Sequence, residues 1–213
     1  MVMIGVLLWS VNVYINIKIL LFIFDCSYLY IFIFTYYMSI FMNLLNEVGE
    51  NGPIILSVLS VYLLWDHNNL LFFYLIGLFC DFILNLVLKG IIQQPRPCFN
   101  SREVQLALKN NKRFVYKNGV LFDLFGMPSG HTEWALYSTI FVYLALRKTN
   151  WLYVYLLISA ITMTQRVVFN YHTIAQILVG APVGALLGYL IYKLAESKLK
   201  GTIREKPDDY GPI

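Results

Sequence analysis

Charged side chains are scarce in this sequence of 213 residues. Only 13% of the residues are Asp, Glu, Lys or Arg, whereas 59% are hydrophobic and 16% are aromatic. Soluble globular domains carry roughly twice this charged fraction, so the composition excludes an ordinary soluble domain. The net charge of +4 could suggest a nucleic-acid partner. However, the Lys and Arg residues form no basic stripe on one face, and we therefore exclude nucleic acid as a partner.

Cysteine and histidine are also few. The three cysteines, Cys26, Cys80 and Cys98, are odd in number and indicate no disulfide framework. The histidines come without the clustered acidic or cysteine ligands that zinc or a pair of metal ions would require. The sequence therefore predicts a site that needs neither a metal nor a cofactor.

Long apolar runs fill most of the chain and have about the length of a membrane crossing. The candidate spans are residues 2–17, 19–41, 53–65, 70–88, 131–146, 151–168 and 173–192. We predict an all-α fold, a polytopic transmembrane helical bundle with about five core spans plus one or two N-terminal apolar segments. The run at 53–65 is short for a crossing, so we expect its helix to begin before Pro53.

We expect three parts along the chain. Residues 1–42 form an apolar N-terminal segment that lacks a basic start or a cleavage site. It consists either of extra spans or of an untranslated extension with Met38 or Met42 as the true start. Residues 43–196 form the membrane domain, and residues 197–213 form a polar tail at the membrane surface. Within the last span, Gly180, Gly184 and Gly188 share one face and indicate close helix packing.

The first of three motifs that carry chemistry is Lys89-Gly-Ile-Ile-Gln-Gln-Pro-Arg96-Pro97. Pro95 and Pro97 restrict the backbone around Arg96, which limits the entropy lost when its guanidinium binds two phosphate oxygens. Lys89 adds a second, more mobile charge. Either cation alone is more typical of an ordinary residue at the membrane surface. The motif indicates phosphate binding only together with the other two.

The second motif is Pro128-Ser129-Gly130-His131, directly before the apolar run that starts at Thr132. A helix N-terminus has unpaired backbone N–H groups and a dipole that favours an anion. Ser129 offers a hydroxyl, Gly130 lets the backbone approach a ligand, and His131 can give a proton to a departing oxygen. In isolation, an ordinary helix cap with a surface histidine would explain the same residues.

The third motif is Arg166-Val-Val-Phe-Asn-Tyr-His172-Thr-Ile-Ala-Gln176, in which His172 and Gln176 are neighbours on one helix face. The spans at 131–146 and 151–168 should form a hairpin. This hairpin brings Arg166 and His172 back to the membrane side that holds Lys89, Arg96 and His131. Three cations and two histidines are therefore expected to converge. His67 has no such neighbours, and we interpret it as structural.

Together these motifs resemble the type-2 phosphatidic acid phosphatase superfamily, which also includes vanadium haloperoxidases. That superfamily has the pattern Lys-x6-Arg-Pro, Pro-Ser-Gly-His and Ser-Arg-x5-His-x3-Asp in this order, and the match covers residues 43–196. The resemblance implies a metal-independent lipid phosphatase in which His172 attacks phosphorus to form a phosphohistidine and His131 protonates the leaving group. It implies a set of phosphate-binding residues, namely Lys89, Arg96, Ser129, Gly130 and Arg166.

Two positions depart from the superfamily pattern. Gln165 stands where serine is expected, and Gln176 stands where the aspartate that orients the histidine is expected. A neutral amide stabilises the imidazolium less than a carboxylate, and it orients the ring only if its oxygen points inward. A weaker nucleophile suits a good leaving group such as the phosphate of a diphosphate, so we expect a phosphoanhydride substrate.

Local sequences look like the dolichyl-diphosphate phosphatase branch, namely Gln-Pro-Arg-Pro-Cys at 94–98, Gly-Met-Pro-Ser at 126–129 and Tyr-His-Thr-x-x-Gln at 171–176. The expected substrate is a polyprenyl (dolichyl) diphosphate in the bilayer, and the oligomeric state is open. Arg147, Lys148 and the basic tail lie opposite the site, which favours a cytoplasmic location for them and a site facing the lumen of the endoplasmic reticulum. The alternatives are a broad phosphatase of lipid monoesters (phosphatidate or sphingoid phosphate) and a non-catalytic lipid-phosphate binder.

Overall fold

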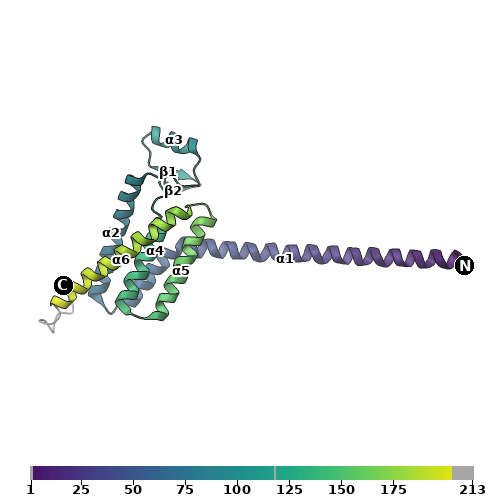
Figure 1. Ribbon diagram of the computed structural model, residues 1–213, viewed down its shortest axis with the longest axis horizontal. Helices are drawn as coiled ribbons and strands as arrows, with labels where there is room; N and C mark the ends of the chain where they lie inside the picture. Colours follow the sequence, from purple (N-terminus) through teal and green to yellow (C-terminus); the bar gives the residue numbers. More distant parts are fainter. Residues whose placement is uncertain (1, 118, 203–213) are drawn as a thin grey trace. The chain divides into compact units, whose positions relative to one another are not determined.

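The computed structural model describes the backbone of residues 2–117 and 119–202 and the side chains of residues 30–116 and 121–198. The elements follow in the order α1 (Val2–Leu64), α2 (Asn68–Ile92), α3 (Ser101–Lys109), β1 (Phe114–Lys117), β2 (Val120–Asp123), α4 (Gly130–Leu146), α5 (Thr149–Val168) and α6 (Ile174–Thr202). The chain divides after Leu44 into two units. All contacts described below belong to the second unit, Leu45–Ile213 (Figure 1).

Four helices within the described residues are long and apolar enough to cross a bilayer: Tyr30–Leu64, Asn68–Ile92, Thr149–Val168 and Ile174–Lys198. The fifth long helix, α4, has 17 residues and contacts α2, α5 and α6. The chain is therefore an integral membrane protein with a polytopic helical bundle, which confirms the predicted fold class.

The structure differs from the expected spans in three places. The gap expected between 41 and 53 is helical, because α1 continues through Pro53; the prediction that this helix begins before Pro53 is thus confirmed. The connection between the expected spans at 70–88 and 131–146 contains α3 and an antiparallel hairpin in which Tyr116 pairs with Leu121. Residues 197–202 of the expected polar tail belong to α6, and residues 203–213 lie outside the described residues.

Small residues let the helices pack closely. A Cβ added at Gly180, Gly184 or Gly188 of α6 would run into the backbone of α4, at Ser129, Glu133 and Tyr137 respectively. The spacing of four residues on both helices keeps their backbones in contact over two turns, which confirms the packing role predicted for these glycines.

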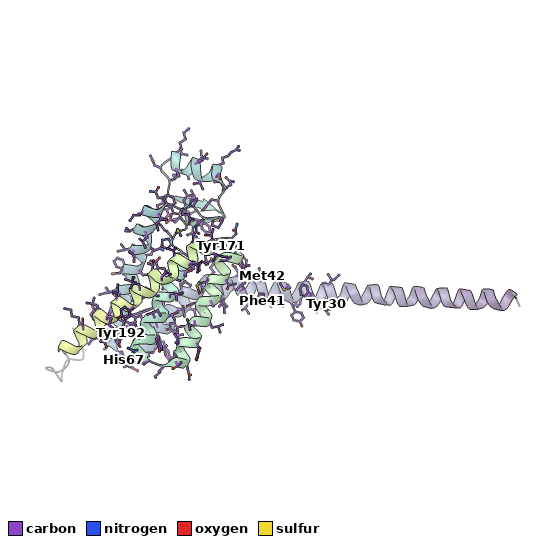
Figure 2. All side chains as sticks on the ribbon, viewed as in Figure 1. Tyr30, Phe41, Met42, His67, Tyr171 and Tyr192 are labelled. Atoms are coloured by element: carbon purple, nitrogen blue, oxygen red, sulfur yellow. The ribbon has the colours of Figure 1, made fainter. Side chains whose placement is uncertain are left out.

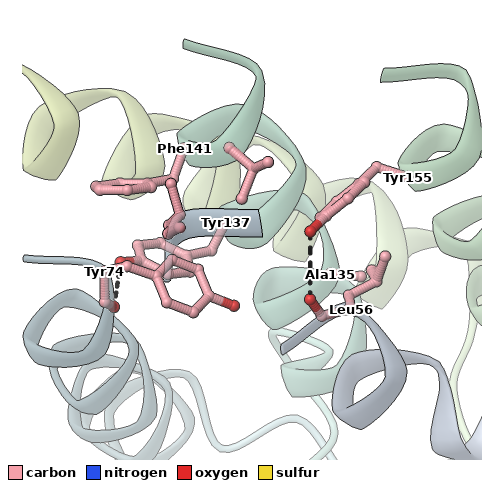
Figure 3. Packing of buried hydrophobic residues seen from close by; sticks show 8 residues of the cluster. Leu56, Tyr74, Ala135, Tyr137, Phe141 and Tyr155 are labelled. Atoms are coloured by element: carbon pink, nitrogen blue, oxygen red, sulfur yellow. Dashed lines mark hydrogen bonds between the residues drawn. The ribbon is translucent and has the colours of Figure 1, made fainter. Parts of the chain in front are cut away.

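Tyrosines occupy the interior of the bundle and have hydrogen-bond partners there (Figure 3). The Tyr137 hydroxyl donates to the backbone oxygen of Tyr74 at 2.7 Å, and the Tyr74 hydroxyl lies 2.8 Å from Ser138 Oγ. Tyr155 lies 2.8 Å from Ser60 Oγ. A polar group without a partner is costly in a medium without water, so these bonds fix how the helices meet.

Candidate active site

The site lies where the C-terminal ends of α2 and α5 meet the N-terminal ends of α4 and α6. A cavity of about 480 Å³ opens there, and its lining includes five predicted site residues: Lys89, Arg96, Gly130, His131 and His172. Tyr171 lies at this end of the bundle, whereas His67 lies at the other end (Figure 2). The helices thus bring both motif histidines to one cavity, and they leave His67 away from it.

One face of α2 leads along the cavity. Asp81, Asn85 and Lys89 are each less than 9% exposed, and all three line the cavity. The spacing of four residues places them on one side of the helix, as the sequence predicts. Asn85 Nδ2 donates to Glu133 Oε2 at 2.7 Å and to the backbone oxygen of Pro128 at 3.3 Å. Asn85 therefore ties α2 to the start of α4.

The imidazole of His172 is held from both sides. Arg96 Nη1 lies 2.8 Å from His172 Nε2, and Gln176 Oε1 lies 3.0 Å from His172 Nδ1. A guanidinium can only donate, so Nε2 must carry a lone pair and Nδ1 must carry the proton. The ring is thus in the tautomer whose Nε2 carries a lone pair and can act as a nucleophile, and this nitrogen lies next to the Arg96 guanidinium.

The amide of Gln176 is oriented by its own partners. Its Nε2 donates to the backbone oxygen of Pro95 at 3.0 Å and to Gln94 Oε1 at 3.2 Å. Both partners accept, so the oxygen of the amide must face His172. This is the orientation that the sequence requires of a glutamine at this position.

Gln176 also begins the helix that carries it. Its Oε1 accepts from the backbone nitrogen of Thr173 at 3.2 Å, and Thr173 Oγ1 accepts from the backbone nitrogen of Gln176 at 3.3 Å. This reciprocal pair is a capping box, Thr-x-x-Gln. The amide lies against Gly126, where an added Cβ would be 2.8 Å from Gln176 Cδ. Gly126 is therefore needed to leave room for the orienting amide.

Arg166 is buried at the end of α5. It is 4% exposed, and its Nε and Nη2 are buried without a hydrogen-bond partner in the described chain. Buried donors almost always have a partner, so such a guanidinium needs an explanation. Arg166 is close enough to interact electrostatically with His131 and Arg96. It therefore adds a third cation to Lys89 and Arg96.

Arg96 is fixed by the segment that follows β2. Its backbone nitrogen donates to the oxygen of Leu124 at 3.1 Å, and its Nε donates to the oxygen of Asp123 at 2.8 Å. Its guanidinium carbon lies 5.9 Å from the centre of the Phe122 ring. Nη1 remains directed at His172. The backbone restriction by Pro95 and Pro97 and these contacts act together to hold the guanidinium in place.

Burial and nearby cations depress the basicity of the central groups. Burial, followed by the charges of Arg96 and Lys89, lowers the pKa of His172 well below 6.5, and the hydrogen bond that Nδ1–H donates to Gln176 opposes this shift. Burial also lowers the pKa of Arg96 below its ordinary value. His172 is thus neutral at neutral pH, as a nitrogen nucleophile must be.

The remaining predicted residues lie close by. The Ser129 side chain is fully buried and accepts from Thr132 Oγ1 at 3.1 Å. The backbone nitrogen of Ser129 donates to the backbone oxygen of Gln176 at 3.1 Å. Gly130 lies against Asn85, whose Oδ1 would be 3.0 Å from an added Cβ. Gln165 lies elsewhere, because it donates to Asn46 Oδ1 of α1 at 2.8 Å. The departure at Gln165 therefore concerns the packing of α5 against α1.

Sequence reasoning did not find two of these positioning residues. Gln94 holds the amide of Gln176, and Thr173 caps α6. The sequence contains a sign of the second, because Thr-x-x-Gln before an apolar run is a capping-box pattern. Nothing in the sequence pairs Gln94 with Gln176.

The fold and the cavity are those of a polytopic membrane protein with cations and histidines gathered at one end of its helices. The chain belongs to the PAP2 superfamily, whose family model matches residues 70–200. The predicted superfamily is thus confirmed. The fold is similar to that in the crystal structure of the first transmembrane PAP2 type phosphatidylglycerolphosphate phosphatase from Bacillus subtilis, which is 20% identical, with a TM-score of 0.52 over 74% of this chain and 77% of that chain.

Curated relatives carry the name dolichyldiphosphatase. The Saccharomyces cerevisiae protein is 29% identical over 133 residues, which cover 58% of this chain and 48% of that protein. Dolichyldiphosphatase 1 of Homo sapiens is 28% identical over 120 residues, which cover 49% of this chain and 44% of that protein. The chain thus spans about half the length of the curated relatives it matches.

Proposed function

We propose that the protein is a metal-independent phosphatase that hydrolyses a polyprenyl (dolichyl) diphosphate to the monophosphate through a phosphohistidine at His172. The observation that carries this proposal is the gathering of Lys89, Arg96, His131 and His172 around one cavity. Arg166 does not line this cavity but lies near His131, and its Nε and Nη2 have no hydrogen-bond partner among the described residues. Phosphate oxygens would satisfy such donors in a bidentate manner. A buried donor left without a partner costs about 1–3 kcal/mol, and a charged donor costs more.

Binding of the terminal phosphoryl group prepares the nucleophile. Lys89, Arg96 and Arg166 take its oxygens, with a further hydrogen bond from Ser129. As Arg96 turns its donors to the phosphate, His172 Nε2 is released from the 2.8 Å contact that occupies its lone pair. The substrate thus both neutralises the cations and exposes the nitrogen that attacks it.

Two displacements complete the reaction. His172 Nε2 forms a bond to the terminal phosphorus while the bond to the bridging oxygen breaks, and His131 gives its proton to the departing lipid monophosphate. Water then gives a proton to His131 and its oxygen bonds to phosphorus. The P–N bond breaks, which releases inorganic phosphate and restores His172. Throughout, Gln176 Oε1 accepts from Nδ1–H and stabilises the charged ring.

The neutral orienting group favours a diphosphate over a monoester. A carboxylate at this position would stabilise the imidazolium and give a stronger nucleophile, whereas an amide contributes only its dipole. A leaving phosphate is a much weaker base than an alkoxide, so its departure needs less help from the nucleophile. The names of the relatives point to the same substrate class.

The cavity also suits a lipid chain. Its lining continues from the cations to Leu78, Phe79, Phe82 and Trp134, and Phe79 and Phe82 are more than 60% exposed on the outer face of α2. A polyprenyl chain would pass from the phosphate site between these side chains into the bilayer. Arg147, Lys148 and Lys193 belong to the opposite end, which supports a site on the lumenal side of the endoplasmic reticulum.

Phosphate release by the purified chain in a bilayer tests the proposal. The substrates are a polyprenyl diphosphate, the polyprenyl monophosphate and phosphatidate, each with and without a metal chelator. We expect the diphosphate to be preferred, with no loss in chelator, and His131→Ala to lower kcat by about 10²- to 10⁴-fold. His67→Ala is the matched control. A preference for phosphatidate would indicate a broad monoester phosphatase, and tight binding without turnover would indicate a lipid-phosphate binder.

A further inference from the structure

One face of the β1–β2 hairpin carries exposed apolar side chains. Phe114 and Tyr116 alternate along β1 and therefore point to the same side, and Tyr116 pairs with Leu121 of β2. These three side chains are 47%, 77% and 52% exposed. We call them the hairpin face. Asp123, which pairs with Phe114, is buried under Arg113 through an ion pair of 2.8 Å.

The other side of the hairpin faces the protein. Phe122 stacks on Tyr171 with ring centres 6.0 Å apart, and Val115 packs on the small cluster of Ala107, Leu124 and Phe125. The hairpin thus has one side packed on the protein and one apolar side on which, among the described residues, Arg113 covers part of Phe114. An apolar surface of this kind marks an interaction site.

The hairpin begins beside the last turns of α2. Arg113 Nη2 donates to the backbone oxygen of Leu86 at 2.9 Å, and its Nη1 would be 3.3 Å from a Cβ at Gly90. Leu86 lies six residues before the end of α2, which corresponds to about 9 Å along the helix axis. At this level the outer face of α2 is apolar, with Val87 at 52% and Ile91 at 72% exposure. The start of the hairpin therefore lies at a level of α2 where the outer face of this membrane helix is apolar.

Basic residues outnumber acidic residues in the segment that contains the hairpin. Between residues 99 and 125 there are five basic residues, Arg102, Lys109, Lys112, Arg113 and Lys117, against two acidic residues, Glu103 and Asp123. Arg113 and Asp123 form an ion pair. Aromatic rings beside Lys and Arg are typical of the interface between acyl chains and headgroups.

We propose that the hairpin face lies in the headgroup region of the bilayer that contains the helices, with Phe114, Tyr116 and Leu121 at the boundary with the acyl chains. This contact bears on the site, because the same hairpin and the residue after it hold Arg96 through the oxygens of Asp123 and Leu124. A hairpin seated in the bilayer keeps the phosphate-binding guanidinium in place only while the protein is in a membrane.

The depth of a nitroxide spin label tests this contact independently of any reaction. The label is attached at position 116 of the full chain in anionic vesicles, after replacement of the native cysteines. A label at Gln105, exposed on α3, is the solvent control, and one at Leu157, 62% exposed on α5, is the lipid control. We expect the label at 116 to be more accessible to oxygen than to a water-soluble nickel chelate, at a depth of about 5–10 Å.

Two outcomes would overturn the proposal: accessibility at 116 equal to that at Gln105, or dipolar broadening at 116 that shows a second copy covering the face.

The effect on catalysis is measured with Tyr116→Ser combined with Leu121→Ser. This variant should lower kcat/KM severalfold on a polyprenyl diphosphate in vesicles and also on a short, water-soluble prenyl diphosphate, because both substrates need Arg96. Unchanged kcat/KM on both substrates would contradict the link between the membrane contact and Arg96. Absence of hydrolysis by the wild type would reject the proposed function and leave the depth result intact.

Discussion

Replacement of Gln176 by glutamate separates orientation from charge at the nucleophile. The side chain keeps its length, so one carboxylate oxygen can still accept from His172 Nδ1, now 3.0 Å from the amide oxygen, and from the backbone nitrogen of Thr173. Thr-x-x-Glu is as good a capping box as Thr-x-x-Gln, so α6 should begin as before. The change therefore adds a negative charge beside the imidazole while the helix stays in place.

The size of the effect follows from the surroundings of His172. In the native protein, burial and two cations lower the pKa of His172 well below 6.5. The hydrogen bond that Nδ1–H donates to Gln176 raises this pKa and so opposes the shift. An opposite charge within about 4–6 Å shifts a pKa by about 1–3 units, or about 1.4–4 kcal/mol. The carboxylate should therefore raise the pKa of His172 by this amount. The second carboxylate oxygen would face two acceptors, the backbone oxygen of Pro95 and Oε1 of Gln94. Repulsion between these oxygens partly opposes the rise in the pKa of His172.

The assay is the pH dependence of kcat/KM on the diphosphate substrate. His172 must be neutral to attack, so activity is lost as the pH falls through its pKa, and a raised pKa moves this acid limb to higher pH. Ionisation of the substrate is the same for both proteins, so the difference between the two profiles belongs to the enzyme. We also expect monoester hydrolysis to rise relative to diphosphate hydrolysis. An acid limb at the same pH in both proteins would refute the role assigned to Gln176.

Three further predictions concern the cations, the positioning amide and the helix packing. Arg166→Lys keeps the charge but loses the planar fork, so kcat/KM should fall by about 10²- to 10³-fold, whereas Arg147→Lys at the other end of the bundle should change nothing. Gln94→Leu removes an acceptor of Gln176 and should lower kcat about tenfold, and Gln94→Glu, which still accepts, should restore it. Gly184→Ala forces a methyl group into the backbone of Glu133 and should lower stability by about 1–3 kcal/mol in a thermal unfolding assay. Leu186→Ala, at a site that is 59% exposed, is its control, and equal melting of the two variants would contradict the packing argument.

Much of the bundle could be predicted because its determinants are local. Apolar runs gave the helices, and the direction of successive spans placed Lys89, Arg96, His131 and His172 at one end, where the structure has them lining one cavity. The roles of these residues in catalysis stay predictions. The division into parts at residues 42 and 196 also stays a prediction.

The remainder depends on contacts that no local pattern encodes. The sequence predicts that the helix begins before Pro53, but it does not predict that α1 is continuous across residues 41–53, where Gly49 and Gly52 pack against Gln165 and Thr162 of α5. The orientation of the Gln176 amide follows from Gln94 and Pro95, more than 80 residues earlier in the sequence. The hairpin of β1 and β2 is different, because the sequence does signal it: Asn118-Gly119 between two apolar runs is typical of a two-residue hairpin turn, and this signal was missed.

The most direct test of the central claim is to trap the phosphorylated residue. The protein is mixed with a polyprenyl diphosphate labelled in its terminal phosphate, quenched in base during the first turnover, and digested for mass spectrometry. We expect an acid-labile phosphate on His172 of the wild type. In His172→Ala the label should be absent and turnover reduced by at least about 10³-fold. Label on another residue, or normal turnover by His172→Ala, would contradict a covalent mechanism at this histidine.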